Sequence, residues 1–256
     1  MKDRFQQLLD ENEILYGLLC RDPTTIQLEL MALAGYHVVW LDLEHAPLTN
    51  EHAVELGRTI SHLGMVPLVR IPELARTHVQ VLLDGGICIL NLPDVRSVGQ
   101  AAEFVRLGKY PPLGKRGVST TTANLDYVLT DPQQDLAAAN SATRLMVMIE
   151  SDQGYSDLDA ILDIEGLDMI TVGPSDWSVQ SGCYDVVAKQ HLAEKIEHVF
   201  KAATKAGKIT VHNVSDVAGV RQCRDWGVRV MMVGVDVHVQ RKALADTLDA
   251  LRNARD

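Results

Sequence analysis

The sequence predicts an α/β fold, a single (β/α)8 TIM barrel over residues 1–256, and three observations favour it. Short apolar runs alternate with longer amphipathic stretches, the order expected for βαβ units and a parallel sheet. Eight such runs occur, which favours a closed barrel over an open doubly wound sheet. The length of 256 residues, 46% of them hydrophobic, is sufficient for one core of that size.

The elements follow from this alternation. In chain order, the predicted strands are Tyr16–Cys20, Val38–Leu43, Val66–Ile71, Ile87–Leu92, Leu145–Ile149, Met169–Val172, Ile209–His212 and Val228–Val233. The clearest helical patterns cover Asp22–Ala34, Asn50–Leu63, Leu192–Ala206 and a final stretch, Gln240–Asp256. Glycines that we expect to end helices just before a strand are Gly35, Gly64, Gly166, Gly207 and Gly227.

One connection, between Leu92 and Leu145, is much longer than a normal crossover. It contains Lys109–Val118, where Pro111-Pro112 and nearby glycines indicate a loop. Long loops at the C-terminal face of a barrel are usually functional. We therefore expect this connection to form a lid or an interface element there.

The composition excludes several classes of function. The net charge of −10 argues against a sequence-independent nucleic-acid binder and against binding to an anionic membrane surface. No apolar run approaches the roughly 20 residues of a membrane span, and the first residues lack the apolar core of a signal peptide. The four cysteines form no Cys-x-x-Cys pair. These features predict a cytoplasmic protein.

The most informative segment follows the second predicted strand, where Asp42, Glu44 and His45 come directly after an apolar run. Arg70 and Glu150 stand at the same point of the third and fifth strands. A barrel directs the carboxyl ends of all its strands into one mouth, which is where catalytic groups lie. The alternative for each residue is an ordinary charged strand end in solvent. His45 is the natural proton acceptor near neutral pH.

Glu150 and Asp176, after strands five and six, form a pair of oxygen ligands suited to an octahedral ion such as Mg²⁺ or Mn²⁺. Two other interpretations stay open, acid–base work with separated pKa values and two solvated strand ends. Gly173-Pro174-Ser175-Asp176 is typical of a helix start, whose free N–H groups bind anions. A substrate carboxylate fits there, although an ordinary capped helix has the same pattern.

Taken together, these segments resemble the class II, metal-dependent pyruvate aldolases of the HpcH/HpaI aldolase/citrate lyase family, from about Tyr16 to Leu248. The stretches that carry the resemblance are Leu41–Pro47, Val66–Pro72, Lys109–Gly117, Val172–Asp176 and Gly234–Asp236. Jointly and in this order they are specific, whereas any one alone is weak.

The resemblance implies a barrel whose eighth helix swaps onto a neighbour, in homohexamers built as trimers of dimers. It implies that Glu150 and Asp176 bind a divalent metal, Mg²⁺, Mn²⁺ or Co²⁺, and that Arg70 holds the oxo group of a 2-oxo acid. It further implies that His45 is the base, oriented by Asp84 or Asp42.

In this reading the segment Gly173 to Asp176, including Pro174 and the backbone of Ser175, takes the substrate carboxylate. The implied reaction joins pyruvate to an aldehyde, or cleaves a 4-hydroxy-2-oxo acid, through a pyruvate enolate. His45 then exchanges the proton of the 4-hydroxyl group.

The sequence departs from the family pattern at Met148, where glutamine is common, and at Leu19, Asn91, His212 and Asn213. We expect these changes to alter the acceptor aldehyde. Two alternatives remain, a lyase or decarboxylase that applies the same enolate chemistry to another oxo acid, and a non-catalytic barrel subunit.

Overall fold

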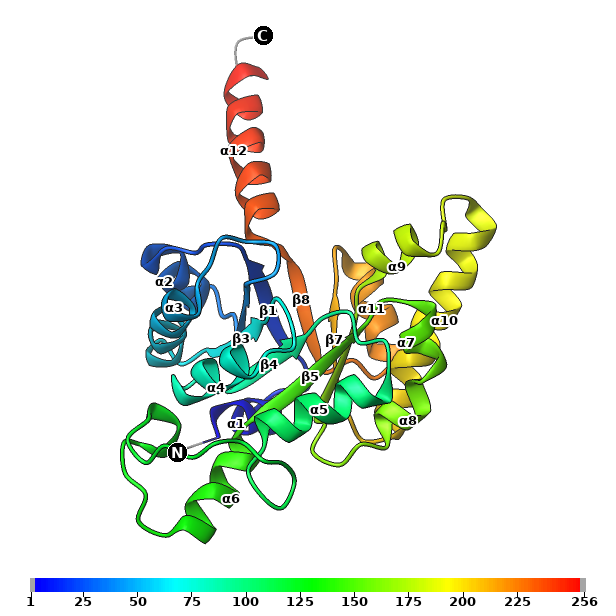
Figure 1. Ribbon diagram of the computed structural model, residues 1–256. Coiled ribbons are helices and arrows are strands. Elements are labelled where there is room, and N and C mark those ends of the chain that lie inside the picture. Colours follow the sequence, from blue (N-terminus) through cyan, green and yellow to red (C-terminus); the bar gives the residue numbers. More distant parts are fainter. Residues whose placement is uncertain (1–2, 254–256) are drawn as a thin grey trace.

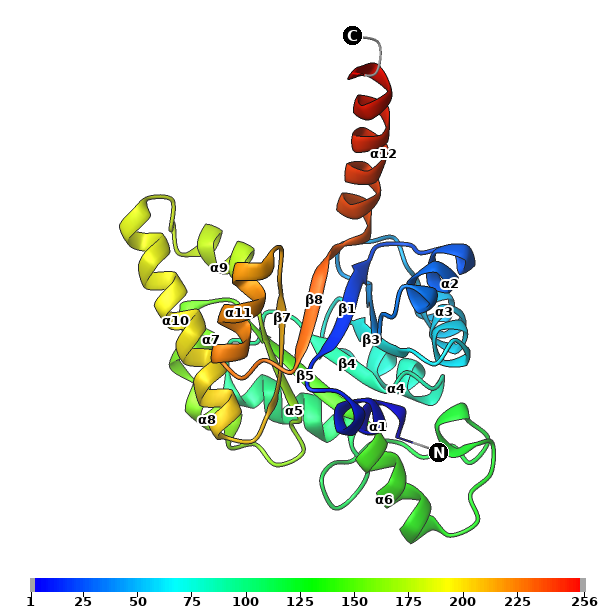
Figure 2. The same cartoon turned by 180° about the vertical axis from the view of Figure 1, so that it is seen from behind.

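The computed structural model describes residues 3–253 as a closed barrel of eight parallel strands that follow one another around the barrel in chain order (Figures 1 and 2). The strands are β1 (Leu15–Cys20), β2 (Val38–Asp42), β3 (Val66–Arg70), β4 (Ile89–Leu92), β5 (Arg144–Ile149), β6 (Met169–Val172), β7 (Ile209–Asn213) and β8 (Val230–Val235). Parallel pairing of β8 with β1 closes the barrel. The predicted TIM barrel is confirmed, and each predicted strand end lies within two residues of the observed one.

The chain also forms helices, most of which cover the outside of the barrel. They are α1 (Arg4–Glu11), α2 (Thr25–Leu33), α3 (Asn50–His62), α4 (Arg76–Asp84), α5 (Val98–Gly108), the 3-10 turn η1 (Ala123–Leu125), α6 (Pro132–Ala142), α7 (Asp152–Ser156), α8 (Leu158–Leu162), α9 (Pro174–Gln180), α10 (Val186–Lys205), α11 (Val217–Asp225) and α12 (Asp236–Asn253). At all five glycines predicted to end helices φ is positive, between 73° and 89°.

The interior of the barrel is packed, and α1 closes its N-terminal end. Apolar side chains from the strands, such as Leu68 and Met146, form one buried cluster with Phe5, Leu8 and Leu9 of α1. The polar N-terminal segment therefore forms an amphipathic helix, α1, that covers the bottom of the barrel. The opposite end, where the strands have their carboxyl termini, is left as the mouth.

After α5, the long connection between Leu92 and Leu145 lies at the N-terminal end of the barrel, where Figure 1 shows α6 beside α1. Its loop is fixed there by Arg116, whose Nη2 donates to Asp84 Oδ1 at the end of α4 (2.6 Å). The buried Lys109 ammonium donates to the Thr143 carbonyl just before β5 (2.6 Å). The expectation of a lid at the mouth is therefore wrong, because α5 returns the chain to the bottom before the loop begins.

The last helix, α12, projects away from the barrel at the mouth end in both views (Figures 1 and 2). Within its described span Asp236 is the only buried residue. It begins four residues before the predicted Gln240, and residues 254–256 of the predicted helix lie outside the described part. Among residues 3–253, no helix is both long and apolar enough to cross a membrane.

Candidate active site

The mouth is organised around an ion pair between neighbouring strands. Asp42 and Arg70 are register partners at the ends of β2 and β3. Arg70 Nε donates to Asp42 Oδ1 (2.8 Å) and Arg70 Nη2 donates to Asp42 Oδ2 (2.5 Å), a bidentate arrangement. Asp42 is fully buried and Arg70 is 7% exposed. The guanidinium is thereby held in one orientation at the floor of the mouth.

Asp42 also shapes the loop that carries His45. Its Oδ1 accepts hydrogen bonds from the backbone N–H groups of Glu44 (3.1 Å) and His45 (3.3 Å). Asp42 thus contacts His45 through the backbone N–H and not through the imidazole. The imidazole itself is half exposed, with its Nε2 3.8 Å from Glu44 Oε2. It is free to reach a molecule in the mouth.

Glu150, directly after β5, is held by the loop that follows β4. Its Oε1 accepts a hydrogen bond from the backbone N–H of Asp94 (2.6 Å), which a positive φ of 48° at Asp94 presents to it. Gly173 faces the other oxygen so closely that a Cβ there would lie 2.1 Å from Glu150 Oε2. The glycine in this position is thus required by the carboxylate rather than by the turn.

Asp176 and Ser175 lie exposed in the first turn of α9, which begins at Pro174. The helix is anchored one residue later. Trp177 is buried, and its Nε1 donates to Asp152 Oδ1 of α7 (2.9 Å). The short helix is therefore fixed against the barrel, although only seven residues long.

The charges of the mouth perturb one another. Burial raises the pKa of Glu150 to about 7, the Asp94 N–H and Arg70 oppose this rise, and the negative charges of Asp176 and Glu44 add to it. Burial likewise raises the pKa of Glu44. Burial alone would raise the pKa of Asp42 too, but the hydrogen bonds and charge of Arg70 hold it below its usual range. Four carboxyl groups thus share a region with one buried guanidinium.

This donor set fits a divalent cation that takes most of its ligands from water and substrate. Among residues 3–253 no group of three His, Cys, Asp or Glu side chains is arranged to enclose a metal. Burial disfavours the charged form of Glu150, and the negative charge of Asp176 adds to this effect. Mg²⁺ binds through one or two carboxylates plus substrate oxygens, and a cation here would relieve that repulsion.

Two residues singled out from the sequence lie away from the mouth, Asp84 as a predicted site residue and His212 as a departure from the family pattern. Asp84 is at the end of α4, near the bottom of the barrel, where it accepts hydrogen bonds from Arg116 and from Gln80 Nε2 (2.7 Å). Within one chain it does not orient His45. His212 faces outward from β7, with its ring centroid 4.7 Å from that of Phe200. It does not line the mouth, whereas Asn213, Leu19 and Met148 lie on the inner face of the barrel.

Three further residues contribute hydrogen bonds at the mouth, and the sequence analysis assigned none of them this role, although Asp236 stands in a stretch that carries the resemblance. Arg21, just after β1, forms a short hydrogen bond through Nη1 with Asp42 Oδ2. Asp94 supplies a backbone N–H, and Asp236 Oδ2 accepts from the backbone of Arg21 (3.2 Å). The rule that polar residues after strands face the mouth would have found all three.

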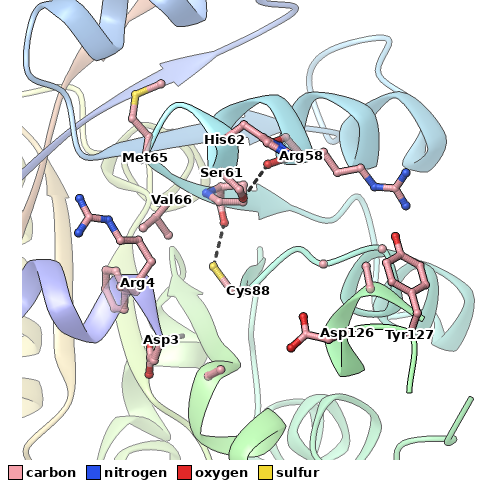
Figure 3. A pocket seen from close by; sticks show the side chains of 17 residues that line it. Asp3, Arg4, Arg58, Ser61, His62, Met65, Val66, Cys88, Asp126 and Tyr127 are labelled. Atoms are coloured by element: carbon pink, nitrogen blue, oxygen red, sulfur yellow. Dashed lines mark hydrogen bonds between the residues drawn. The ribbon is translucent and has the colours of Figure 1, made fainter. Parts of the chain in front are cut away.

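The described residues line several cavities, and one of them reaches the carboxyl end of β7 at Asn213. Another, of about 440 Å³, lies at the N-terminal end, lined among others by Arg4, Ser61, Cys88 and Tyr127 (Figure 3). Cys88 is fixed there, its thiol donating to the Pro67 carbonyl at 3.7 Å. This cavity contains none of the residues that converge on Arg70, so it is separate from the candidate site.

Comparison with known proteins supports the same assignment. Residues 20–243 match the family model of the HpcH/HpaI aldolase/citrate lyase family. The chain is 30% identical over 256 residues to a 2-keto-3-deoxy-L-rhamnonate aldolase of Salmonella gallinarum (strain 287/91 / NCTC 13346), covering all of this chain and 95% of the relative.

Two solved structures agree with it. A HpcH/HpaI aldolase/citrate lyase family protein from Burkholderia cenocepacia J2315 is 28% identical with a TM-score of 0.87, covering 98% of this chain and all of the other. A HpcH/HpaI aldolase from Desulfitobacterium hafniense DCB-2 is also 28% identical with a TM-score of 0.87, covering 96% of each chain. The chain therefore belongs to the HpcH/HpaI aldolase/citrate lyase family and is a carbon–carbon lyase.

Proposed function

We propose that the protein is a divalent-metal-dependent aldolase that forms or cleaves 4-hydroxy-2-oxo acids through a pyruvate enolate. One observation carries the proposal. A buried guanidinium, fixed by Asp42, faces the same space as the carboxylates of Glu150 and Asp176. Such a site offers positive charge for an oxygen that becomes negative, next to a place for a cation.

Glu150 and Asp176 would hold the ion, which supplies Lewis-acid polarisation of the carboxylate and oxo groups of a bound 2-oxo acid. The first-turn N–H groups of Ser175 and Asp176 have no partner within α9 and point toward the N-terminal end of that helix. Together with Gly173 and Pro174, which bring the backbone close to Glu150, they would receive the substrate carboxylate.

Arg70 would donate to the oxo oxygen of the substrate. Removal of a methyl proton turns this oxygen into an enolate oxygen, and a preorganised donor in a buried site stabilises that charge most. Arg70 is suited to the task because Asp42 and Glu44 already fix its orientation, with Glu44 Oε2 3.0 Å from Arg70 Nη1. No reorganisation is then needed during the reaction.

His45 would exchange the proton of the 4-hydroxyl group. In cleavage the imidazole takes this proton as the bond between C3 and C4 breaks, leaving the aldehyde and the enolate of pyruvate. In synthesis it returns the proton to the alkoxide. Its exposed ring on a loop anchored by Asp42 suits a base that meets substrates of varied length.

The protein is further proposed to assemble by exchange of α12, as a hexamer built from dimers. The exposed apolar residues Leu244, Leu248 and Leu251 form a stripe along α12. A complementary exposed row on α2 consists of Ile26, Leu30 and Leu33, which are 67%, 59% and 85% exposed. In a (β/α)8 barrel the helix after the last strand normally packs beside the helix after the first strand, which here is α2. We therefore take α2 of a second copy as the acceptor for α12.

The test is to offer the protein 4-hydroxy-2-oxo acids that differ in their aldehyde part. Cleavage is measured as release of pyruvate in a coupled assay. We expect activity to disappear in EDTA and to return with Mg²⁺, Mn²⁺ or Co²⁺. Full activity in EDTA would refute the metal requirement. Exchange of deuterium into pyruvate with no cleavage of any such acid would instead favour a lyase of another oxo acid.

A further inference from the structure

Beneath Arg70, the barrel interior contains polar groups that no neighbour satisfies. The indole Nε1 of Trp40 and both amide atoms of Asn91 have no hydrogen-bond partner among the described residues. Trp40 is 2% exposed and Asn91 is fully buried. Burying unpaired polar groups is unfavourable, so three such atoms in one apolar interior call for a partner.

The strand register places these groups together. Arg70 and Asn91 are paired across β3 and β4, and paired residues point to the same face. In a barrel of this type, alternate strands contribute the four side chains of one layer. By register, one layer consists of Trp40, Asn91, Thr171 and Met232. The next layer toward the mouth consists of Leu19, Arg70, Met148 and Asn213. The polar atoms therefore lie one layer below the guanidinium.

Most of the surrounding side chains offer no partner, and the hydroxyl of Thr171, in the same layer, is not hydrogen-bonded to Trp40 or Asn91. Arg70 turns toward β2, where Asp42 accepts from its Nε and Nη2. On the other side of Asn91, β5 contributes Met146 and Met148, both buried in the interior cluster. A thioether is at most a weak acceptor, and it donates nothing to the Asn91 Oδ1.

We propose that Trp40 and Asn91 bind internal water under Arg70, and that Asn91 is a positioning residue for the guanidinium. Buried water typically makes two to four hydrogen bonds to such unpaired groups. The Trp40 N–H and the Asn91 amide offer two kinds of donor and one acceptor, which is sufficient for a bridging water.

The link to Arg70 follows from its donors. A guanidinium has five N–H groups. Asp42 takes two of them, whereas Glu44 Oε2 forms an ion pair with Nη1 at 3.0 Å without accepting a hydrogen bond from it. Three remain, which leaves one for the substrate oxo oxygen and one for the water held by Asn91. The water then supports the edge of the guanidinium that no acid holds. This role rests on the proposed function of Arg70.

The water site is tested without any assay of activity. In protein labelled with [15N]tryptophan, we expect the indole N–H of Trp40 to show magnetisation transfer from water. Trp177 is the internal control, because its Nε1 is bonded to Asp152 Oδ1 and should show none. Trp40→Phe assigns the resonance. If the Trp40 N–H shows no more magnetisation transfer from water than the Trp177 N–H, the proposed water site is wrong.

The positioning role is tested by two substitutions with opposite effects on packing and polarity. Asn91→Leu keeps the shape and removes the polar atoms, whereas Asn91→Ser leaves a hydroxyl and room for water. We measure exchange of deuterium into the methyl group of pyruvate, at saturation and at low pyruvate, together with Tm. We expect the parent to exchange fastest, Asn91→Ser more slowly and Asn91→Leu most slowly, with the rate of Asn91→Leu reduced about tenfold or more. The expected order of Tm places Leu above Ser.

A rate for Asn91→Leu equal to or above that of Asn91→Ser would overturn the positioning role, because packing alone would then explain the site. Asn140→Leu is the matched control. Asn140 is a buried asparagine at the far end of the barrel whose Oδ1 accepts from the Tyr110 N–H (2.7 Å). It should lower Tm and leave the exchange rate unchanged. If the unaltered protein exchanges no pyruvate hydrogen, the proposed function fails, and the Trp40 resonance still decides the water site.

Discussion

Arg70, at the end of β3, donates two parallel hydrogen bonds to Asp42, at the end of β2, with lengths of 2.8 and 2.5 Å. The pair lies in a mouth rich in carboxylates. This pair fixes both the guanidinium at the mouth and, through Asp42, the loop that carries His45. Its geometry depends on the planar fork of arginine, which a lysine does not reproduce.

Replacing Arg70 by lysine should therefore keep the charge and lose the function. We expect pyruvate hydrogen exchange to fall by roughly 10² to 10³-fold, the cost of removing one preorganised donor. Circular dichroism and Tm report whether the fold is kept. Arg58→Lys, at the other end of the barrel, is the control. An Arg70→Lys protein with wild-type exchange would show that the fork is not needed.

His45→Gln should reduce cleavage of a 4-hydroxy-2-oxo acid by roughly 10² to 10⁴-fold, the usual contribution of a general base. Because His45 is proposed to act on the 4-hydroxyl group, exchange of the pyruvate methyl hydrogens should suffer less than cleavage. His52→Gln, an exposed histidine of α3, should change neither rate. Equal loss of both reactions in His45→Gln would assign the residue to enolate formation instead.

Glu150→Gln should abolish tight binding of Mn²⁺ in a calorimetric titration while the protein stays folded. The buried carboxylate, disfavoured by Asp176 and Glu44, becomes a neutral amide that no longer neutralises a cation. Its metal-free form should be at least as stable as the parent at neutral pH, because a buried charge is removed. Glu165→Gln, on the surface, serves as control. Unchanged Mn²⁺ affinity in Glu150→Gln would move the metal elsewhere.

Leu248→Lys on α12 should shift the protein to smaller species in analytical ultracentrifugation. The leucine is 48% exposed and belongs to the apolar stripe proposed to pack on a second copy. A buried, unpaired ammonium at such an interface is costly. Asp246→Lys, on the opposite side of the same helix, controls for the added charge. Identical sedimentation of both variants and the parent would argue against exchange of α12.

Acid should destabilise the protein partly through His212. Burial lowers its pKa to about 4, so the folded state keeps the ring neutral while an unfolded chain binds a proton near pH 6.5. Its contribution to the free energy of unfolding is therefore complete above about pH 6.5 and is lost as the pH falls toward 4. Between pH 7 and pH 5, the Tm of His212→Phe should fall by a few degrees less than the Tm of the parent. The substitution removes about 1–2 kcal/mol of the pH-dependent free energy of unfolding. His191→Phe, on the exposed face of α10, should show no such difference.

The strands and most helices were predictable because their signals are local. Apolar runs of four to six residues, glycines with positive φ at helix ends, and polar residues directly after strands each reflect a short stretch of chain. The convergence of Asp42, Arg70 and Glu150 followed from one topological rule, that parallel strands of a barrel end at one mouth. Arg21 and Asp94 obey the same rule.

Other features could be assigned only once the chain direction was known. Asp84 ends a helix that runs back from the mouth, so it lies with Arg116 at the bottom instead of beside His45. His212 sits at the end of a strand whose side chains alternate, and only its contact with Phe200 shows that it faces the helices. The helical nature of the polar N-terminus depends on the barrel bottom that Phe5 covers.

By itself, the sequence determined the eightfold βα repeat and the set of polar residues at the mouth, because hydrophobic periodicity and strand ends are properties of short segments. Tertiary structure alone decided how those residues share hydrogen bonds and charge. The two bonds from Arg70 to Asp42, the raised pKa of Glu150 and the unpaired layer of Trp40 and Asn91 arise from contacts between strands. Such contacts depend on register and burial, which no local pattern contains.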